Sequence, residues 1–325
     1  GHAGIEAAFA VSRLGLHCQL ITADKTSIGR LSCNPAIGGL AKTHLVKEID
    51  ALGGIMGVAA DACALQYKTL NKTKGRAVWS LRAQVDKKKY PNFIQKKITK
   101  NPLIKVVEGE VVGFEIKNKK IEGVVLSDNK KVLCGGVVVA CGTFVNGLIH
   151  TGCDSYSAGR FGEKNVQDIS FNLKKVGHSF MRLKTGTPPR VSLKTINLKF
   201  TDTALGDLDF FPFSIKTKRN SFKKNLPCYS IHTNKNVHSL IEKNLSKSAM
   251  FSGKIQGVGP RYCPSIEDKI FRFKERNSHQ LFLEPEWEGS DQIYINGFST
   301  SLPYDIQLQS LRKIKALKKV DFIRP

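Results

Sequence analysis

The stretch that decides the fold stands at the start of the sequence, where residues 1–22 read GHAGIEAAFAVSRLGLHCQLIT. Within residues 4–15, apolar side chains recur with the three- and four-residue spacing of one helix face. Gly15 ends this pattern, and residues 17–22 form a short apolar run that is typical of a buried strand. Glycines therefore stand in a loop before a helix that leads into a strand. This is the order of a dinucleotide-binding unit after its first strand.

Gly1 and Gly4 supply the second half of a G-x-G-x-x-G loop. Such glycines let backbone N–H groups and a helix N-terminus approach a pyrophosphate. A tight turn that binds nothing uses similar glycines. The helix and strand that follow the loop are therefore the main support for a dinucleotide site. The acidic residue that usually binds the ribose should follow the second strand, and Asp24 is a weak candidate near that place.

The sequence has a large excess of positive charge. Its 325 residues include 51 Lys and Arg against 27 Asp and Glu, which gives a net charge of +24. Such an excess favours polyanions, above all nucleic acid, although lysine-rich codon usage would give the same count. Residues 210–241 contain no acidic residue, yet they include Lys216, Lys218 and Arg219. Such a stretch is typical of a solvated face or of a surface that contacts phosphates.

Composition also excludes several classes of protein. No apolar run reaches the length of a membrane span, and the first residues do not resemble a signal peptide. The eight cysteines form no C-x-x-C pair, so a zinc site is not expected, and the thiols are expected to be reduced in the cytoplasm. The sequence has no initiator Met and no first strand, so we expect a chain truncated at both ends.

Two cysteines stand where a helix is expected to begin. An Asn-Pro pair follows Cys33 and predicts a helix over residues 35–52. Cys263 precedes a serine that can cap a second helix, and Arg261 lies two residues before it. A helix N-terminus and a nearby cation both stabilise a thiolate, so both cysteines are candidate reactive thiols. The alternative for each is an inert cysteine in a turn.

The middle of the chain alternates like a β-meander, with strands expected at residues 105–108, 111–116, 121–126 and 137–140. The last strand leads into small residues, which suit a close approach of the backbone to a cofactor. Helices are expected at residues 166–177, 236–245 and 302–319. The change of pattern after residue 190 indicates an inserted domain. Before it, Lys184 and Arg190 flank a proline-rich turn and are candidate phosphate ligands, or solvated charges of a linker.

Several longer segments closely resemble the MnmG (GidA) family, whose members are tRNA uridine 5-carboxymethylaminomethyl modification enzymes. They occur in the family's order and extend over essentially the whole chain: residues 32–39 (SCNPAIGG), 142–150 (GTFVNGLIH), 183–190 (LKTGTPPR), 228–234 (CYSIHTN), 257–269 (GVGPRYCPSIEDK), 280–286 (QLFLEPE) and 299–303 (STSLP). Because several of these segments are long and unusual, the sequence is identified as a member of this family, as its FAD-binding subunit.

The resemblance implies an α/β fold. It consists of an FAD-binding Rossmann-like domain of the glutathione-reductase type, with the β-meander and an inserted α+β domain. Residues 1–190 would form the FAD-binding domain without its first strand, and residues 191–295 an inserted domain associated with NADH. Residues 296–325 would begin an incomplete return to the FAD-binding domain. The C-terminal helical domain, which the family uses to meet MnmE and tRNA, lies outside this sequence.

The resemblance also implies an activity. It is the FAD-dependent modification of the wobble uridine (U34) of tRNA at C5, which adds an aminomethyl or carboxymethylaminomethyl group. Methylene-tetrahydrofolate would donate the carbon and NADH would reduce the flavin. The implied protein is a cytoplasmic homodimer that forms a heterotetramer with the GTPase MnmE.

Site residues follow from the resemblance position by position. Gly1, His2, Ala3 and Gly4 match the FAD loop, Val111 matches an FAD contact, and Cys33 and Cys263 match the family's two functionally important cysteines, which we expect to be catalytic. The stretch assigned to NAD comprises Gly259, Pro260, Arg261, Tyr262, Cys263, Pro264, Ser265, Ile266, Glu267, Asp268, Lys269, Ile270, Phe271, Arg272 and Phe273. This sequence departs from the family at Val166, where a serine contacts FAD, at Trp287, where glycine is usual, and at Ile295, where proline is usual.

Three other functions remain open. The nearest is the related folate-dependent flavoprotein that methylates a different tRNA uridine at C5, and the motifs around Cys33 and Cys263 fit it less well. A generic FAD/NADH oxidoreductase of the disulfide type would need a C-x-x-x-x-C pair, which the sequence lacks. A tRNA-binding flavoprotein without catalysis would have no reason to keep both cysteines.

Overall fold

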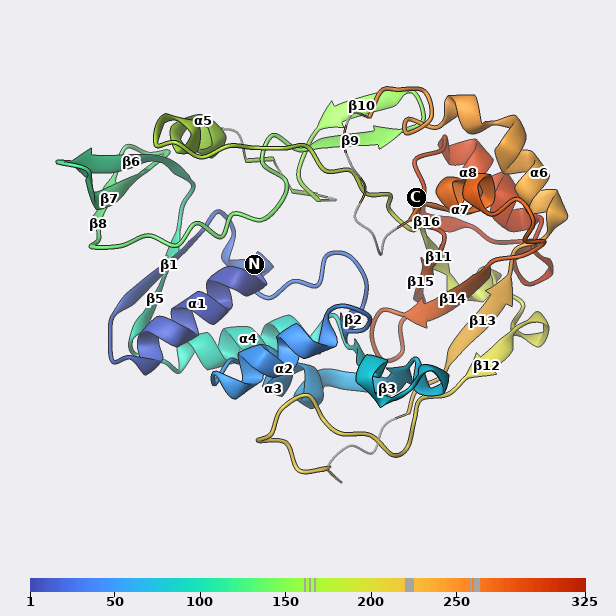
Figure 1. The fold of residues 1–325 in the computed structure, drawn as a ribbon, viewed down its shortest axis with the longest axis horizontal. Helices are drawn as coiled ribbons and strands as arrows, with labels where there is room; N and C mark the ends of the chain where they lie inside the picture. Colours follow the sequence, from blue (N-terminus) through green and yellow to red (C-terminus); the bar gives the residue numbers. More distant parts are fainter. Residues whose placement is uncertain are drawn as a thin grey trace.

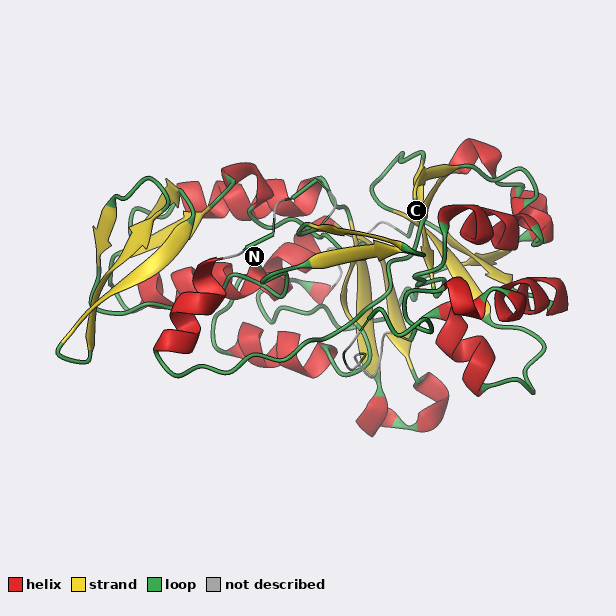
Figure 2. Ribbon diagram, turned by 90° about the horizontal axis from the view of Figure 1, so that it is seen from above, coloured by secondary structure: helices red, strands yellow, loops and turns green. Residues whose placement is uncertain are grey.

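The computed structural model describes residues 1–160, 162–163, 165–166, 168–219, 225–255, 257, 259 and 264–325. Figure 1 shows an N-terminal lobe that contains α1 to α4 and a second lobe built on a six-stranded sheet. Seen from above, the small sheet β6-β7-β8 lies at one end of the elongated molecule and the six-stranded sheet at the other (Figure 2). The fold is α/β, as the sequence predicts.

The first helix and strand confirm the dinucleotide-binding pattern. Helix α1 (His2–Arg13) leads into β1 (Cys18–Thr22), and Ile5 and Ala8 bury the apolar face of the helix. Strand β5 (Ile104–Glu108) pairs in parallel with β1. Its expected place in the meander is therefore wrong. A short apolar run fits a buried parallel strand as well as a meander strand, and the spacing of its side chains does not identify its neighbour.

The helix expected over residues 35–52 is wrong in its first half. Strand β2 (Ala36–Gly38) pairs antiparallel with β4 (Ser80–Val85), and α2 (Thr43–Ala51) begins only after it. Gly38 has a φ of +79°, which is not helical, and a Cβ there would lie 2.4 Å from the Leu81 carbonyl oxygen. The glycine thus allows the backbone of β4 to approach. Cys33 consequently does not precede a helix N-terminus.

The remaining elements of the N-terminal lobe surround these strands. Helices α3 (Met56–Cys63) and α4 (Lys89–Thr99) pack against each other, and β3 (Ala64–Leu70) pairs with β4. The meander proper consists of β6 (Val111–Lys117), β7 (Lys120–Leu126) and β8 (Lys131–Leu133). Helix α5 (Asp168–Lys175) confirms the helix expected near residue 170, and β9 (Leu148–Thr151) and β10 (Asp154–Ser157) form a hairpin.

The strand expected at residues 137–140 is wrong for the described chain. This segment has no strand partner among the described residues, and Val138 is 68% exposed. A run of valines satisfies the local preference for a strand, but a strand also needs a neighbour for its backbone hydrogen bonds. Residues 137–140 nevertheless pass close to α1, because a Cβ on Gly4 would lie 3.3 Å from the Ala140 Cβ.

The second lobe is a mixed structure around one sheet. Its strand order is β12-β13-β14-β15-β11-β16, with bounds Asp202–Ala204, Cys228–His232, Gln280–Pro285, Gln292–Asn296, Arg190–Ser192 and Phe322–Arg324. Its helices are α6 (Lys235–Lys243), α7 (Ile266–Arg272) and α8 (Tyr304–Arg312). The helix expected to end at residue 319 ends at Arg312, and a short 3-10 turn follows (Lys315–Leu317). One core holds residues from Val191 to Val320, on both sides of the predicted boundary at residue 295.

A loop from the second lobe anchors itself in the first. Phe213, fully buried, lies in the core of the N-terminal lobe. The Asp61 carboxylate accepts hydrogen bonds from the backbone N–H groups of Phe213 and Ser214, at 2.9 and 2.8 Å, and from the Tyr67 hydroxyl. Asp50 accepts a further bond from the Ile215 N–H at 2.9 Å. Two buried carboxylates thus bind the loop through its backbone, which makes this connection independent of most of its side chains.

We expect Asp61→Ala to destabilise the protein by about 3 kcal/mol, because it leaves buried N–H and O–H donors without an acceptor. Urea unfolding at pH 7 measures the change. The control is Asp209→Ala, whose carboxylate is exposed and pairs with Arg219 on the surface; its effect should stay within about 0.5 kcal/mol. Equal effects of the two variants would contradict the anchoring role of Asp61.

Candidate site at the junction of the two lobes

The glycine loop leads directly into α1. Gly1 is the N-cap of the helix, and none of the described side chains caps it. The first N–H groups of a helix have no partner within the helix, and they carry the positive end of its dipole. The loop therefore has the donors and the polarity that a diphosphate needs.

Two polar side chains are buried beside this loop. The Nε2 atom of His2 and the hydroxyl of Tyr90 are buried and have no hydrogen-bond partner among the described residues, and the two ring centroids lie 5.6 Å apart. Burial lowers the pKa of His2 to about 4, with Arg160 acting in the same direction. His2 is thus neutral at pH 7. Buried groups without partners are uncommon, and here they adjoin the position expected for a cofactor.

Cys33 lies on a loop that two arginines hold in place. The Arg160 guanidinium donates to the Ser32 hydroxyl at 2.5 Å, and the Arg190 guanidinium donates to the Cys33 carbonyl oxygen at 2.5 Å. The thiol itself is exposed. The geometry fixes the backbone on both sides of the sulfur and leaves the thiol accessible. The helix N-terminus that the sequence predicts for it is absent, so nearby cations are the remaining source of positive potential.

Arg190 belongs to a buried ion cluster around Glu286. Glu286 is 1% exposed; Lys87 lies 2.7 Å from its carboxylate, Arg190 3.2 Å and Arg324 3.8 Å. Gln292 also donates to it. Burial raises the pKa of Glu286, but the three cations outweigh this effect and hold its pKa below the usual range. One buried carboxylate therefore faces three positive charges from different parts of the chain.

A second ion cluster adjoins the first. Glu163 pairs with Arg30 at 2.9 Å and with Arg160 at 2.7 Å. Arg30 also lies 3.8 Å from Asp24, whose carboxylate accepts hydrogen bonds from the N–H and hydroxyl of Thr26. Asp24 thus caps a local turn (Lys25–Ser27). Its proposed role as a ribose ligand stays a prediction.

Between these clusters lies a cavity of about 350 Å³, which we call the basic cavity. Its walls carry five cations and two carboxylates, and both lobes contribute to it: Arg30, Leu31, Ser32, Lys87, Lys88, Arg160, Glu163, Glu286, Trp287, Gln292 and Arg324. The Lys88 ammonium lies over the Trp287 ring, 4.0 Å from its centroid. The lining therefore combines excess positive charge with an aromatic face, next to the Cys33 loop.

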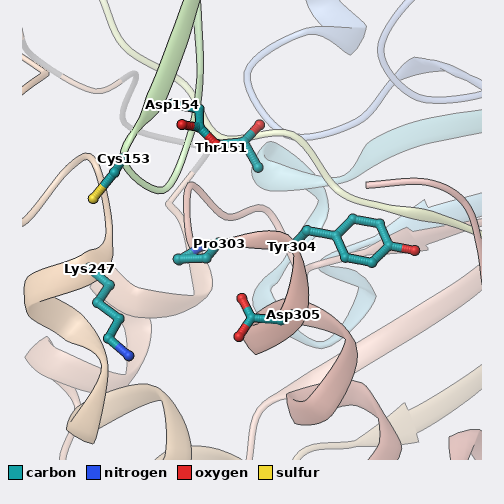
Figure 3. Close-up of a pocket in the computed structure, with 7 residues that line it drawn as sticks. All are labelled: Thr151, Cys153, Asp154, Lys247, Pro303, Tyr304 and Asp305. Carbon is teal, nitrogen blue, oxygen red and sulfur yellow. The ribbon is translucent and has the colours of Figure 1, made fainter.

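A separate cavity of about 360 Å³ lies beside the β9–β10 hairpin (Figure 3). It is lined by Thr151, Cys153, Asp154, Lys247, Pro303, Tyr304 and Asp305. The tip of the hairpin packs against the second lobe at Gly152, where a Cβ would lie 2.6 Å from Pro303. One lysine and two aspartates line this cavity, so it lacks the positive excess of the basic cavity.

The stretch assigned to NAD is described only in part. Cys263 and its neighbours at 260–262 lie outside the described residues. Ser265 caps α7 as predicted, since its hydroxyl accepts from the Asp268 N–H at 3.1 Å. Ile266, Glu267 and Ile270 are buried in the second lobe. Their side chains contribute to the core of that lobe, and the exposed positions of α7, such as Phe271, are the ones available to a ligand.

The two candidate phosphate ligands of the proline-rich turn already form ion pairs within the protein. Arg190 is 3% exposed, so its interpretation as a solvated linker charge is wrong, and its role as a phosphate ligand stays a prediction. Lys184 pairs with Asp268 at 3.2 Å. Val111 begins β6 and is half-buried, and Val166 forms an isolated bridge with Val145. Neither Val111 nor Val166 lines the basic cavity, and the FAD contact expected at Val111 stays a prediction.

Sequence reasoning missed most of the basic cavity. Its charged residues are separated by up to 294 positions, as Arg30 and Arg324 are, and none belongs to a recognisable spacing. The one available signal was Trp287, which departs from the family pattern. The described part of the chain contains no group of three His, Cys, Asp or Glu residues that could hold a metal ion. Likewise, none of the described helices has the length and apolarity to cross a membrane.

Comparison with known proteins gives consistent matches. The family model "Glucose inhibited division protein A" matches residues 1–325. A tRNA uridine 5-carboxymethylaminomethyl modification enzyme MnmG from Chlorobium phaeobacteroides is 45% identical over 326 residues, and one from Thermodesulfovibrio yellowstonii is 46% identical over 325. Each alignment covers 100% of this chain and 52% of the relative, so the chain spans about half the length of these relatives.

A solved structure supports the fold directly. The Aquifex aeolicus GidA structure in its form I crystal has a TM-score of 0.93 and 42% identity to this chain. The alignment covers 100% of this chain and 55% of that one. The form II crystal gives a TM-score of 0.90. The arrangement of the two lobes is thus close to that of a related experimental structure.

Glu286→Gln tests the buried ion cluster. At pH 7 it should destabilise the protein by about 3 kcal/mol, since it leaves three largely shielded cations without their anion. The folded-state pKa of Glu286 is lowered, so its contribution is full above the ordinary glutamate pKa of about 4.3 and is lost as the pH falls through the lowered value. The difference from the unaltered protein should therefore narrow below pH ~4 in urea unfolding.

Glu288→Gln is the matched control, because its carboxylate is exposed and pairs with the exposed Lys89 at 2.6 Å. Its effect should be small at every pH. A destabilisation by Glu286→Gln that stays constant from pH 7 to pH 3 would show that the cluster acts through packing and not through charge.

Proposed function

Because the chain belongs to the Glucose inhibited division protein A family, we propose that it is the FAD-binding half of an enzyme that modifies the tRNA wobble uridine at C5. The observation that carries the proposal is the match over residues 1–325, which includes the glycine loop and the Cys33 loop. The product would be the aminomethyl or carboxymethylaminomethyl nucleoside. The names of the relatives in Chlorobium and Thermodesulfovibrio support this reaction class.

FAD would bind at the start of α1. The N–H groups at the start of α1 and the backbone of residues 2–4 suit its diphosphate. His2 and Tyr90 provide buried polar atoms without described partners beside this place. A bound flavin supplies the redox chemistry that substitution through a one-carbon unit requires. The protein's own contribution is to bind it, to orient it and to hold Cys33 nearby.

The cysteines would activate the uracil ring. C5 of uracil is a poor nucleophile, but a thiolate that bonds to C6 moves the electron pair of the C5–C6 double bond onto the C5 side. Proton loss from C5 and departure of the thiolate would restore the ring after substitution. We assign the attack to Cys263 and place Cys33 near the flavin. The exposed Cys33 thiol, on a loop held by Arg160 and Arg190, supports an active role for that loop.

The other partners are proposed from the family. They are NADH at residues 191–295 and the 259–273 stretch, methylene-tetrahydrofolate as carbon donor, and the GTPase MnmE in a heterotetramer with the homodimer, in the cytoplasm. The tRNA would lie across a positive surface. Within the predicted basic stretch, Arg219 pairs with Asp209 at 2.6 Å and lies over the Phe211 ring, 4.3 Å from its centroid. This loop offers charge and an aromatic face for such a contact.

Gly4→Val in the full-length protein should remove most of the bound flavin. A Cβ at this position lies 3.3 Å from the Ala140 Cβ and 3.7 Å from Leu20, so a branched side chain would push α1 out of place. The measurement is the flavin absorbance near roughly 450 nm, a general property of the cofactor. Gly135→Val is the control, because no atom of the described residues lies within 4 Å of its Cβ position. A normal flavin content in Gly4→Val would contradict the loop assignment.

Cys263→Ser should abolish uridine modification while FAD and tRNA binding remain nearly intact, because loss of an activated nucleophile lowers the rate by orders of magnitude. The assay combines full-length protein, MnmE, GTP, methylene-tetrahydrofolate, NADH and tRNA. Cys18→Ser, half-buried in β1, is the control and should keep its activity. Near-normal product from Cys263→Ser would exclude the nucleophile role. The mass of the product nucleoside separates this function from the C5 methyltransferase alternative.

A further inference from the structure

The basic cavity keeps a surplus of positive charge after its internal ion pairs are formed. Its two carboxylates are already shared, Glu163 between Arg30 and Arg160 and Glu286 among Lys87, Arg190 and Arg324. Lys88 adds a further charge at the wall. The described lining therefore has more cations than anions, in a place where several of them are shielded from water.

The surplus of positive charge in the cavity is energetically unfavourable. Burial lowers the pKa of Lys87, and Glu286 only partly offsets that effect, while Arg190 and Arg324 act in the same direction as burial. Burial and Arg190 likewise lower the pKa of Arg324. These cations repel one another at short range, and a bound anion would relieve that repulsion. An oxyanion with several acceptor oxygens suits such a set, because guanidinium groups bind phosphate through paired N–H donors.

An aromatic ring adjoins the cations. Trp287 lines the cavity, half-buried, with the Lys88 ammonium 4.0 Å from its ring centroid. Nucleobases stack on such rings with little sequence preference, and cations beside the ring hold the backbone. Ser32, which also lines the cavity, directly precedes Cys33. A strand that enters the cavity would thus pass the exposed thiol.

We propose that the basic cavity binds a backbone phosphate of single-stranded RNA, whose neighbouring base stacks on Trp287. The cavity adjoins the glycine loop, because Arg160, which lines it, also acts on the pKa of His2; the test below therefore saturates the protein with FAD, so that the diphosphate of the cofactor is already bound. The inference rests on the proposed function only in taking RNA as the source of the phosphate. Its consequence is that the cavity guides a nucleotide next to the modified uridine and so places the uridine at the Cys33 loop.

The test uses full-length, FAD-saturated protein and a fluorescein-labelled single-stranded RNA pentanucleotide, with anisotropy measured over a range of salt concentrations. Trp287→Gly, which installs the residue usual in the family, should weaken binding about tenfold through lost stacking. Lys88→Gln should also weaken it about tenfold and reduce the salt slope by about 0.7. Lys88 is exposed, so this variant leaves the folded core intact. Lys120→Gln, at the exposed start of β7, is the matched control and should change neither quantity.

A second measurement locates the RNA. With 4-thiouridine in the oligonucleotide, irradiation should crosslink it to the peptide that contains Trp287, and inorganic phosphate at high concentration should reduce the yield. Unchanged affinity in both Trp287→Gly and Lys88→Gln would overturn the proposal. Binding of NADH or inorganic pyrophosphate in the cavity without RNA binding would overturn it as well. These measurements do not require catalysis. Loss of uridine modification alone would therefore not contradict the RNA site, and loss of RNA binding would not contradict the flavin assignment.

Discussion

The Glu286 carboxylate is the interaction on which the site depends. It follows β14 in the second lobe, and its partners come from β11, from β16 and from Lys87 at the start of the α4 region. A buried charge is tolerable only with partners, because its desolvation costs more than one ordinary ion pair returns. Through Arg190 the same cluster reaches the Cys33 carbonyl oxygen. The position of the exposed thiol in the first lobe is therefore fixed by a carboxylate in the second.

This dependence explains why the two lobes act as one unit. The N-terminal lobe also receives Phe213 from the second lobe, and Arg82 of β4 donates two hydrogen bonds to Glu284, at 2.8 and 2.9 Å. These contacts combine apolar burial with charge, and they join the two lobes at further places. A cofactor at α1 and a substrate at the Cys33 loop would thus be held by elements from both lobes. Neither lobe alone presents the complete set of side chains.

The sequence predicted the parts of the fold that depend on local spacing. The first helix and strand, the glycine loop, the hairpin around residue 118 and the Ser265 cap follow from neighbours a few residues apart. The errors have one cause. At residues 36–38 the apolar spacing fits a helix, but β4 offers backbone hydrogen bonds and Gly38 accepts a positive φ, so a strand forms. At residues 104–108 and 137–140 the pattern indicates a strand and does not determine its partner. Partners far along the chain decide each case.

The same limit applies to the charge. A net charge of +24 has two explanations at the level of composition, a nucleic-acid surface or lysine-rich codon usage. Codon usage accounts for exposed lysines, because an additional surface cation costs little. It does not account for Lys87, Arg190 and Arg324 around the buried Glu286 carboxylate, because these cations are largely withdrawn from water and share one anion. The positions of the charges, and not their number, therefore separate a general composition from a site for a polyanion.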